Sequence, residues 1–593
     1  MNKILFAGSE VMPFAATGGL GDVLGALPPS LAAVHPDWDV RVVMPLYDQI
    51  GEEWREKMTL VKGITVTLAW RKQSCMIYYL EVKGVKYYFL GNKYYFGRKA
   101  LYGYDDDAER FAFFSRAVLD LMEAVNFFPD ILHANDWQTA LSVISLKQER
   151  GLMKGYADVK AVYTIHNIDY QGAYALNTIN NIFGLPEEQM GIVEYNGALN
   201  LTKGAIVCAD HITTVSPQYS EEIKTEEVSH GLHHIIKSHG DKISGIINGI
   251  DEVLYNPAID EDIPHKFTCN DFSGKKKNKA ILQKEFGLAV DPDVPLIAMV
   301  SRLAEHKGFD LVCKAAEEML KDDVQFVLLG TGDPAFEKFF EALGKKYPGK
   351  AGIKLAYNRK LSKLIYAGAD MFLMPSKSEA CGLAQMIASR YGTVPIVRET
   401  GGLYDTIKRY THDRRGNGFT FSVYNAEGML YVIKEAESVY KDKKQWDKLS
   451  SKIMQIDFSW KTSAGKYAAL YEKLAPAKKV TPEKVVPAKT TPVKETAPEK
   501  EATTAKEVTA AKIVEPVKEA ILTKVVAPVK EAALTKVVAP VKEVILTKVV
   551  APVKEATPTK EVTPVKETAP KKEETPKKES ETPSAEKCAT AEE

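Results

Sequence analysis

Two cations stand five positions apart at the end of an apolar run, in the segment SRLAEHKG at residues 301–308. Guanidinium and ammonium groups bind phosphate oxygens, Arg302 through a planar fork and Lys307 as a compact charge. If a helix begins here, the two cations are separated by about one and a half turns and can both face a departing phosphate. The alternative is a pair of solvated surface charges, the usual environment of Arg and Lys.

A carboxylate precedes a Gly-Leu pair in the segment PSKSEACGL at residues 375–383. At the end of a strand, Glu379 can accept hydrogen bonds from sugar hydroxyls while the N–H groups of the next helix face the ligand. The alternative is an acidic residue in a first helical turn, where the helix dipole favours it. A similar run, TGGLYD at residues 400–405, follows the next apolar run.

The first apolar run of the chain leads into a glycine-rich loop, TGGLGD at residues 17–22. Glycines let the backbone approach a ligand closely, and the free N–H groups of the following helix attract an anion such as a diphosphate. A plain glycine-rich turn is the alternative.

Two other patterns do not lead to a predicted site. The run GTGDPA at residues 330–335 resembles a dinucleotide-binding fingerprint, but such a site needs an acidic residue about twenty positions further on. Residues 346–355 contain none. The acidic run Asp105–Asp107 lies in a polar loop where solvated carboxylates are expected, so we predict neither a metal nor a cofactor.

The four loops need a scaffold that brings them together, and the apolar runs predict one. Nine short, nearly continuous runs rich in β-branched residues alternate with helical stretches such as 22–34 and 109–125. Buried parallel strands joined by crossover helices give this pattern. The predicted strands are 3–8, 40–45, 130–135, 160–165 and 211–216 in the first half, and 296–301, 325–330, 371–375 and 394–398 in the second.

The strand pattern starts again after residues 245–257, GIINGIDEVLYNP. Two doubly wound α/β sheets joined by a hinge are therefore the simplest arrangement. Open α/β sheets bind ligands beyond the carboxyl ends of their strands. Each of the four loops follows a predicted strand, as that rule requires.

The end of the chain has a different composition. Residues 475–593 contain 22 Lys, 19 Glu and 14 of the 30 Pro, and they repeat a twelve-residue unit such as TKVVAPVKEAAL from Thr523. Proline interrupts helix and sheet in each unit, and Val alone buries too little surface to offset the ordering of the chain. We predict a disordered tail, whose partner the sequence does not identify.

The overall composition excludes several classes of protein. Because 78 basic residues balance 78 acidic ones, the chain lacks the basic character of a nucleic-acid binder. Six Cys lie far apart without a C-x-x-C pair, which argues against a disulfide scaffold or a zinc ribbon. The four-residue apolar run at the start is too short for a signal peptide, and no stretch suits a membrane span. We expect a cytoplasmic protein without nucleic-acid or membrane partners.

Taken together, the motifs resemble those of bacterial glycogen synthases and plant starch synthases over residues 1–474. The segments that carry the resemblance are TGGLGDV, HANDWQTAL (133–141), TIHNIDYQG (164–172), NGID (248–251), SRLAEHKG, EACGL (379–383), RYGTVPIVRETGGLYDT (390–406) and DFSWKTSA (457–464). The resemblance implies an α/β fold of the GT-B type, with two Rossmann-like domains facing each other across a cleft. The expected parts are an acceptor-side domain 1–245, a nucleotide-sugar domain 246–455, a helical segment 456–474 and the tail 475–593.

The family transfers glucose from ADP-glucose to the non-reducing end of an α-1,4-glucan with retention of configuration. ADP-glucose and glycogen are therefore the implied partners, and Arg302 and Lys307 are implied to stabilise the departing diphosphate. The implied catalytic residues are Glu379, Arg302, Lys307, His166 and Asp136. The implied substrate-binding residues are Thr17, Gly18, Gly19, Asp22, Asn248, Tyr357, Cys381, Gly382, Leu383, Thr400 and Gly401.

Some of these residues also have simpler structural interpretations. A lone His after a strand, such as His166, is commonly a packing residue. Asp136 could cap the helix that starts at Trp137, the usual role of Asp at such a place. Cys381 is more simply a small packing group than a nucleophile.

One departure from the family pattern leaves alternatives open. Ala16 stands where the glycine loop of the family usually has Lys, so the donor or acceptor could be handled differently. One alternative is another retaining GT-B enzyme that uses UDP-glucose. The other is a catalytically weak scaffold that binds glucan.

Overall fold

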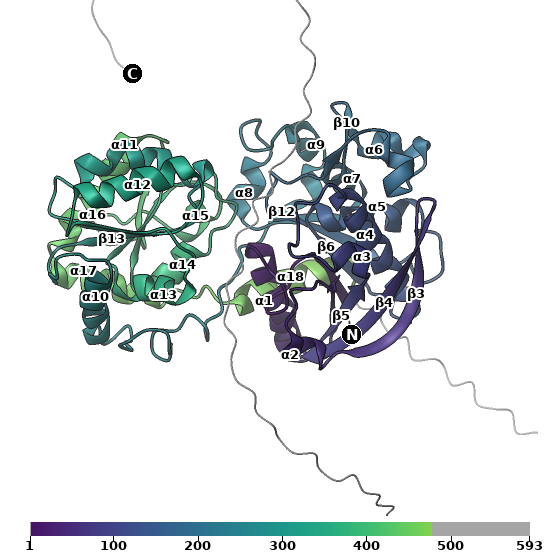
Figure 1. Ribbon diagram of the computed structural model, residues 1–593, viewed down its shortest axis with the longest axis horizontal. Coiled ribbons are helices and arrows are strands. Elements are labelled where there is room, and N and C mark those ends of the chain that lie inside the picture. Colours follow the sequence, from purple (N-terminus) through teal and green to yellow (C-terminus); the bar gives the residue numbers. More distant parts are fainter. Residues whose placement is uncertain (1, 477–593) are drawn as a thin grey trace, which may run out of the picture. The chain divides into compact units, whose positions relative to one another are not determined.

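The computed structural model describes residues 2–476, which form two parallel-stranded sheets covered by helices (Figure 1). We call the part built on the first sheet the first lobe and the part built on the second sheet the second lobe. The predicted tail lies outside the described residues, apart from its first two. No helix among residues 2–476 has the length and apolar character needed to cross a membrane.

The first sheet has nine strands, and its core is parallel. Its order is β12 (Ile243–Gly245), β11 (His211–Thr214), β7 (Lys160–Ile165), β6 (Ile131–Asn135), β1 (Lys3–Ala7), β2 (Asp39–Pro45), β5 (Val85–Gly91), β4 (Arg71–Val82) and β3 (Thr59–Leu68). β4 runs antiparallel to β5, and β3 antiparallel to β4. The strands β3 to β5 were not predicted. β3 is exposed over its first half and β4 has no continuous buried run, whereas β5 is a buried apolar run that the prediction missed.

The helices of the first lobe connect these strands. They are α1 (Gly19–Val34), α2 (Glu52–Arg55), α3 (Lys93–Phe96), α4 (Asp107–Ala124), α5 (Trp137–Gln148), α6 (Met190–Val193), α7 (Leu201–Cys208), α8 (Pro217–Glu222) and α9 (His233–Ser238). A small sheet of β8 (Ala173–Tyr174), β10 (Ala198–Asn200) and β9 (Glu194–Tyr195) lies in the connection between β7 and α7.

The second sheet has six strands, all parallel, in the order of a doubly wound fold. The order is β15 (Ala351–Lys354), β14 (Gln325–Leu329), β13 (Leu296–Val300), β16 (Met371–Met374), β17 (Val394–Arg398) and β18 (Phe419–Phe421). Its helices are α10 (Ser273–Glu285), α11 (Phe309–Met319), α12 (Pro334–Lys346), α13 (Arg359–Gly368), α14 (Ala384–Arg390), α15 (Gly401–Thr406), α16 (Ala426–Tyr440) and α17 (Lys443–Met454).

Alternate residues of the second sheet pack on opposite layers. In β13, Ile297 and Met299 pack in the cluster that contains Phe309 of α11, whereas Leu296 and Ala298 pack in the cluster that contains Leu282 of α10. In Figure 1, α11 and α12 lie on one side of this sheet, and α10, α13 and α14 lie on the other. Burial on both faces explains why the strands read as continuous apolar runs.

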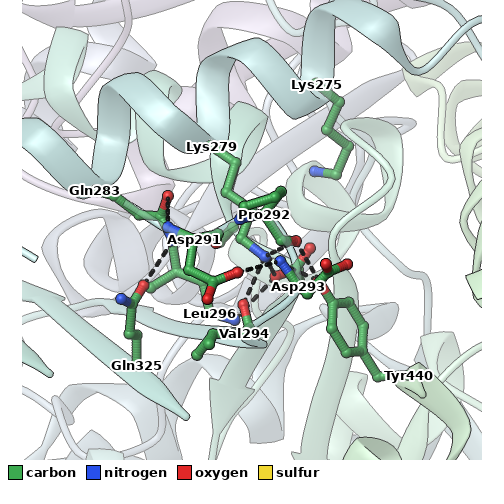
Figure 2. A network of polar contacts seen from close by, with 12 residues as sticks. Lys275, Lys279, Gln283, Asp291, Pro292, Asp293, Val294, Leu296, Gln325 and Tyr440 are labelled. Atoms are coloured by element: carbon green, nitrogen blue, oxygen red, sulfur yellow. Dashed lines mark hydrogen bonds and ion pairs between the residues drawn. The ribbon is translucent and has the colours of Figure 1, made fainter. Parts of the chain in front are cut away.

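A buried polar network attaches α10 to the second sheet (Figure 2). The Lys279 ammonium lies 2.7 Å from a carboxylate oxygen of Asp370 and donates to the carbonyls of Pro292 and Val294. The Gln283 amide donates to Gln325 at 2.8 Å. Because each buried polar group has a partner, the network fixes α10 on the sheet without an unpaired charge.

The last helix of the described chain, α18 (Trp460–Leu474), follows the second lobe but packs in the core of the first. The connection passes beside the earlier linker, because Ile250 pairs with Ser459 and the Ser463 hydroxyl donates to the Ile247 carbonyl at 2.6 Å. The chain therefore crosses between the lobes twice, and the two crossings contact each other.

Candidate active site

The strand order of the second sheet explains why distant segments meet. β13 lies between β14 and β16, so the chain leaves β13 toward one edge and later returns to its other side at β16. This change of direction leaves a crevice beyond the carboxyl ends of the two strands. The loop after β13 carries Arg302 and Lys307, and the loop after β16 carries Glu379.

Lys307 and Glu379 form an ion pair at this crevice. The Lys307 ammonium lies 2.9 Å and 2.7 Å from the two carboxylate oxygens, and the Ser376 hydroxyl donates to the second oxygen at 3.1 Å. Glu379 is buried, with a side chain 10% exposed, and that of Lys307 is 20% exposed. Gly308 allows the two loops to approach, since it has φ 79° and a Cβ there would lie 2.0 Å from the Pro375 carbonyl oxygen.

A cavity of about 160 Å³ opens beside this pair. Its lining includes Lys307, Glu379, Gly382 and Leu383 together with the ends of β13 and β16. A larger hollow of about 690 Å³ lies between β3 and α4 in the first lobe. Both arginines there are already paired, Arg116 with Glu149 and Arg150 with Asp120, so the smaller cavity is the better candidate for chemistry.

Cys381, which directly precedes Gly382, is buried and contacts Asn248 of the linker. Burial raises the pKa of the Cys381 thiol to about 12, and the Asn248 N–H group faces the sulfur. A thiol with that pKa is not a nucleophile at neutral pH. The Asn248 side-chain oxygen is buried and accepts no hydrogen bond from any described residue. A buried acceptor without a donor is rare in folded proteins and suits a ligand hydroxyl.

Two of the predicted residues on the second lobe are exposed. Arg302 is exposed and forms no ion pair with the described part of the chain. Tyr357, in the loop between β15 and α13, is 90% exposed. Neither side chain is held by packing, so both can move toward a ligand.

A carboxylate of the first lobe accepts hydrogen bonds from Thr400 and Gly401. The Thr400 hydroxyl donates to one carboxylate oxygen of Glu222 at 3.0 Å, and the Gly401 N–H donates to the other at 2.8 Å. These two donors are therefore already used within the protein.

In the first lobe, a buried carboxylate organises the glycine loop. Glu10 accepts hydrogen bonds from the Thr17 N–H at 2.6 Å, the Thr17 hydroxyl at 2.9 Å and the Gly18 N–H at 3.0 Å. A Cβ placed on Gly18 or Gly19 would have no atom within 4 Å. The fold itself does not require glycine at these two positions, which leaves open space for a ligand.

Asp22 lies in the first turn of α1 and is exposed. Although its side chain reaches solvent, the surrounding protein raises its pKa, while the Arg359 guanidinium of the second lobe opposes this rise. Arg359 also hydrogen-bonds Tyr255 of the linker. A cation thus faces the glycine loop from the second lobe, in a chain that has Ala16 in the loop itself.

His166 follows β7 and is neutral, because burial lowers its pKa to about 3. Its Nε2 lies 2.9 Å from the side-chain oxygen of Asn135. The Asn135 amide nitrogen donates to two backbone carbonyls, which fixes the oxygen toward His166. Nε2 therefore carries the proton, and Nδ1 has a free lone pair that can only accept a hydrogen bond.

Asp136 lies at the end of the neighbouring strand, β6. It precedes α5, yet its side chain makes no cap bond to that helix and instead accepts from the His166 N–H at 2.8 Å. Burial raises its pKa to about 7, and Glu10 adds to the rise. Its φ of 57° is uncommon for a residue other than glycine, and such strain is frequent at functional sites.

Three residues of this arrangement were missing from the sequence prediction: Glu10, Asn135 and Glu222. Asn135 ends β6 and Glu10 lies three residues after the end of β1, and polar residues close to the ends of central strands were a usable signal. Glu222 ends a short helix and binds a residue 178 positions away, so no local pattern identifies it.

The acidic run near α4 is engaged in ion pairs. Asp106 pairs with Arg98 at 2.5 Å, and Asp107 pairs with Arg110. Within residues 2–476, no group of three or more His, Cys, Asp or Glu side chains is placed to hold a metal ion.

Comparison with protein families gives one match within each of the two lobes. Residues 3–238 match the family model described as the starch synthase catalytic domain. Residues 281–453 match the model described as glycosyl transferases group 1.

Curated relatives and solved structures agree with this result. A glycogen synthase from Geobacillus thermodenitrificans is 44% identical over 81% of this chain and 99% of its own length, and one from Lactococcus lactis is 46% identical over 80% and 100%. The catalytic domain of starch synthase IV from Arabidopsis thaliana, bound to ADP and acarbose, has a TM-score of 0.73 at 34% identity, covering 80% of this chain and 99% of that domain. A sucrose-phosphate synthase from Thermosynechococcus elongatus shares the fold alone, with a TM-score of 0.51 at 16% identity, covering 80% of this chain and 99% of its own.

Proposed function

The chain belongs to the glycogen and starch synthase family of GT-B glucosyltransferases, and from this premise we propose that its donor is ADP-glucose and its acceptor the non-reducing end of an α-1,4-glucan such as glycogen. The observation that carries the proposal is the Lys307–Glu379 pair at the crevice between β13 and β16. The solved starch synthase relative, which is bound to ADP and acarbose, supports a nucleotide and a glucan as ligands of this fold.

Lys307 and Arg302 bind the diphosphate. An ammonium has three N–H donors, and Glu379 takes two of those of Lys307, which leaves one for a phosphate oxygen. Arg302 is exposed and free to close on the same group. As the bond from the anomeric carbon to phosphate breaks, negative charge grows on the diphosphate, and fixed cations in a dry site stabilise it most.

The transferring glucose is recognised by acceptors that lack a donor in the protein. The Asn248 side-chain oxygen and His166 Nδ1 each have room for one hydrogen bond, and sugar hydroxyls supply such donors. Cys381, Gly382 and Leu383 form the wall behind the sugar and the phosphate. Because His166 is neutral, it accepts a hydrogen bond from a sugar hydroxyl without placing a positive charge beside an oxocarbenium-like centre.

Configuration is retained because the acceptor hydroxyl attacks from the face that the diphosphate leaves. A bond forms from the acceptor oxygen to the anomeric carbon, the bond from that carbon to the phosphate oxygen breaks, and the phosphate takes the proton of the acceptor. Neither the charge nor the proton requires a metal in this scheme. Asp136, which accepts from the His166 N–H, is the carboxylate that we assign to the first-lobe side of the transferring sugar.

The remaining predicted residues bind the ends of the two substrates. The open space at Gly18 and Gly19 admits a ligand against the backbone, with Asp22 beside it. Tyr357 is exposed and flanks the adenine. Thr400 and Gly401 shape the surface of the phosphate site, because their hydrogen-bond donors are already bound by Glu222. We also propose that the acceptor-side domain ends at residue 245 and the nucleotide-sugar domain at residue 455. The proposed location of the protein is the cytoplasm.

The test compares two donors and two acceptor conditions. We expect ADP release from ADP-glucose when glycogen is present, little release without it, and slower release of UDP from UDP-glucose. Equal or faster UDP release would favour the UDP-glucose enzyme. Glycogen binding without release of either nucleotide would favour the scaffold.

A further inference from the structure

Two short helices, one from each lobe, each place a carboxylate at the first turn of the other helix. Glu222, the last residue of α8, accepts from the Thr400 hydroxyl at 3.0 Å and from the Gly401 N–H at 2.8 Å, at the start of α15. In return, Asp405 of α15 accepts from the Gln218 N–H of α8 at 2.8 Å. Carboxylates are favoured at such N–H groups, so the two helices stabilise each other across the lobes.

Glu222 accepts a hydrogen bond from the first N–H group of α15, a bond that the N-cap residue Thr400 does not provide. Thr400 stands at the N-cap position but makes no side-chain cap bond, because its hydroxyl turns to Glu222. Thr400 is buried, with 4% of its surface exposed, and the Gln218 amide donates to the Glu222 carboxylate at 3.2 Å. The start of α15 is therefore held from the first lobe.

The turn at Thr400–Gly402 lies directly on the loop that carries Glu379. The Gly402 N–H donates to the Glu379 carbonyl at 3.2 Å. A Cβ on Gly401 would come within 2.0 Å of the Glu379 carbonyl oxygen, so the two backbones are in close contact. A shift of this turn must move the backbone of Glu379.

We propose that Glu222 is a positioning residue for the donor site. It holds Thr400 and Gly401, and through Gly402 it sets the backbone of Glu379, whose carboxylate orients Lys307. The donor site of the second lobe is thus completed by a carboxylate of the first lobe. This role rests on the function proposed above, because it acts through Glu379 and Lys307.

The experiment measures donor KM, kcat and ADP binding for Glu222→Ala and Glu222→Gln. We expect Glu222→Ala to raise the donor KM, weaken ADP binding and lower kcat/KM by about tenfold to a hundredfold, as small displacements in active sites do. Glu222→Gln keeps one acceptor oxygen and should recover part of the loss. Thermal unfolding of each variant shows whether the fold is kept.

Two variants serve as controls. Glu221→Ala removes the neighbouring carboxylate, which is exposed and pairs with Lys224 at the surface, and should leave the kinetics unchanged. Asp405→Ala breaks the reciprocal bond, which does not involve the Thr400–Gly402 turn, and should cost less than Glu222→Ala.

The outcomes separate this role from the proposed function. Tighter or unchanged ADP binding in Glu222→Ala, or equal losses in Asp405→Ala and Glu222→Ala, overturns the positioning role. If Lys307→Ala is inactive while Glu222→Ala has normal kinetics, only the role of Glu222 fails. If Lys307→Ala keeps its rate, the proposed function itself fails.

Discussion

Asp136 carries a charge that its surroundings disfavour. Its pKa is raised to about 7 by burial, with Glu10 adding to the rise. An unfolded Asp titrates near 3.9, so the folded state keeps this proton to higher pH. The free energy of unfolding therefore falls as the pH rises from about 4 to about 7, and the ionised residue destabilises the fold at neutral pH. Such a cost is typical of a residue kept for chemistry.

We predict that Asp136→Asn is more stable than the natural chain but less active. Asn keeps an acceptor for the His166 N–H and tolerates a positive φ. At pH 8 its unfolding temperature should be about 2–4 °C higher, with a smaller difference at pH 5, and turnover should fall at least about a hundredfold. Thermal unfolding at both pH values and initial rates give the result. A less stable variant at pH 8 would show that the ionised carboxylate supports the fold.

The Lys307–Glu379 pair supplies the second prediction at this scale. Lys307→Ala and Glu379→Gln should each lose about 10²–10⁴-fold in kcat, because each removes a charge placed for the departing diphosphate or the sugar. Glu379→Gln conserves shape and its Ser376 contact, so it should unfold at nearly the natural temperature. Lys377→Ala is the matched control, since that ammonium is exposed beside Glu305. Near-normal rates in both site variants would contradict the assignment.

At the scale of elements, glycine is needed in two loops for opposite reasons, in one for the fold and in the other for the ligand. Gly308 joins the loops after β13 and β16 with a positive φ and no room for a Cβ, whereas Gly18 opens α1 with free space around it. Gly308→Ala should therefore lower the unfolding temperature and the activity together. Gly18→Ala should fold normally and raise the KM of a substrate at least about tenfold, as only the ligand meets the new methyl group. Equal stability losses would show that Gly18 is required by the fold.

The same distinction explains how far the sequence could predict these elements. The central strands, such as β1 and β13, are buried on both faces, so a continuous apolar run is enough to identify them. The strand β3 is largely exposed and therefore has no such run. Residues that act at strand ends were found where a motif marked them, as with Glu379.

Partners that depend on distant segments were not predictable in this way. Asn135 acquires its role from His166, and Glu222 from Thr400, only after the sheets have formed. The sequence also offered two interpretations of Asp136, and it could not show that the side chain binds His166 rather than capping α5.

At the scale of the whole molecule, α18 connects the end of the second lobe to the core of the first. The Tyr471 hydroxyl lies 2.6 Å from His133 Nδ1, and His133 Nε2 contacts the Thr164 hydroxyl on β7, two residues before His166. Burial lowers the pKa of His133 to about 3, so this network is uncharged in the native state. α18 thus supports the strand that ends at the candidate site.

Truncation at either end of α18 tests this dependence. A chain ending at Leu474 keeps all of the helix and should retain folding and activity within about twofold, because the segments beyond a domain's last packed element tolerate removal. A chain ending at Ser459 loses Trp460, Tyr467 and Tyr471 from the core of the first lobe. Each large aromatic contributes about 3–5 kcal/mol, so their combined loss approaches the whole stability of a domain and the protein should not fold. Soluble yield, thermal unfolding and glycogen-dependent ADP release measure both outcomes; aggregation of the longer chain would show that residues after Leu474 belong to the fold.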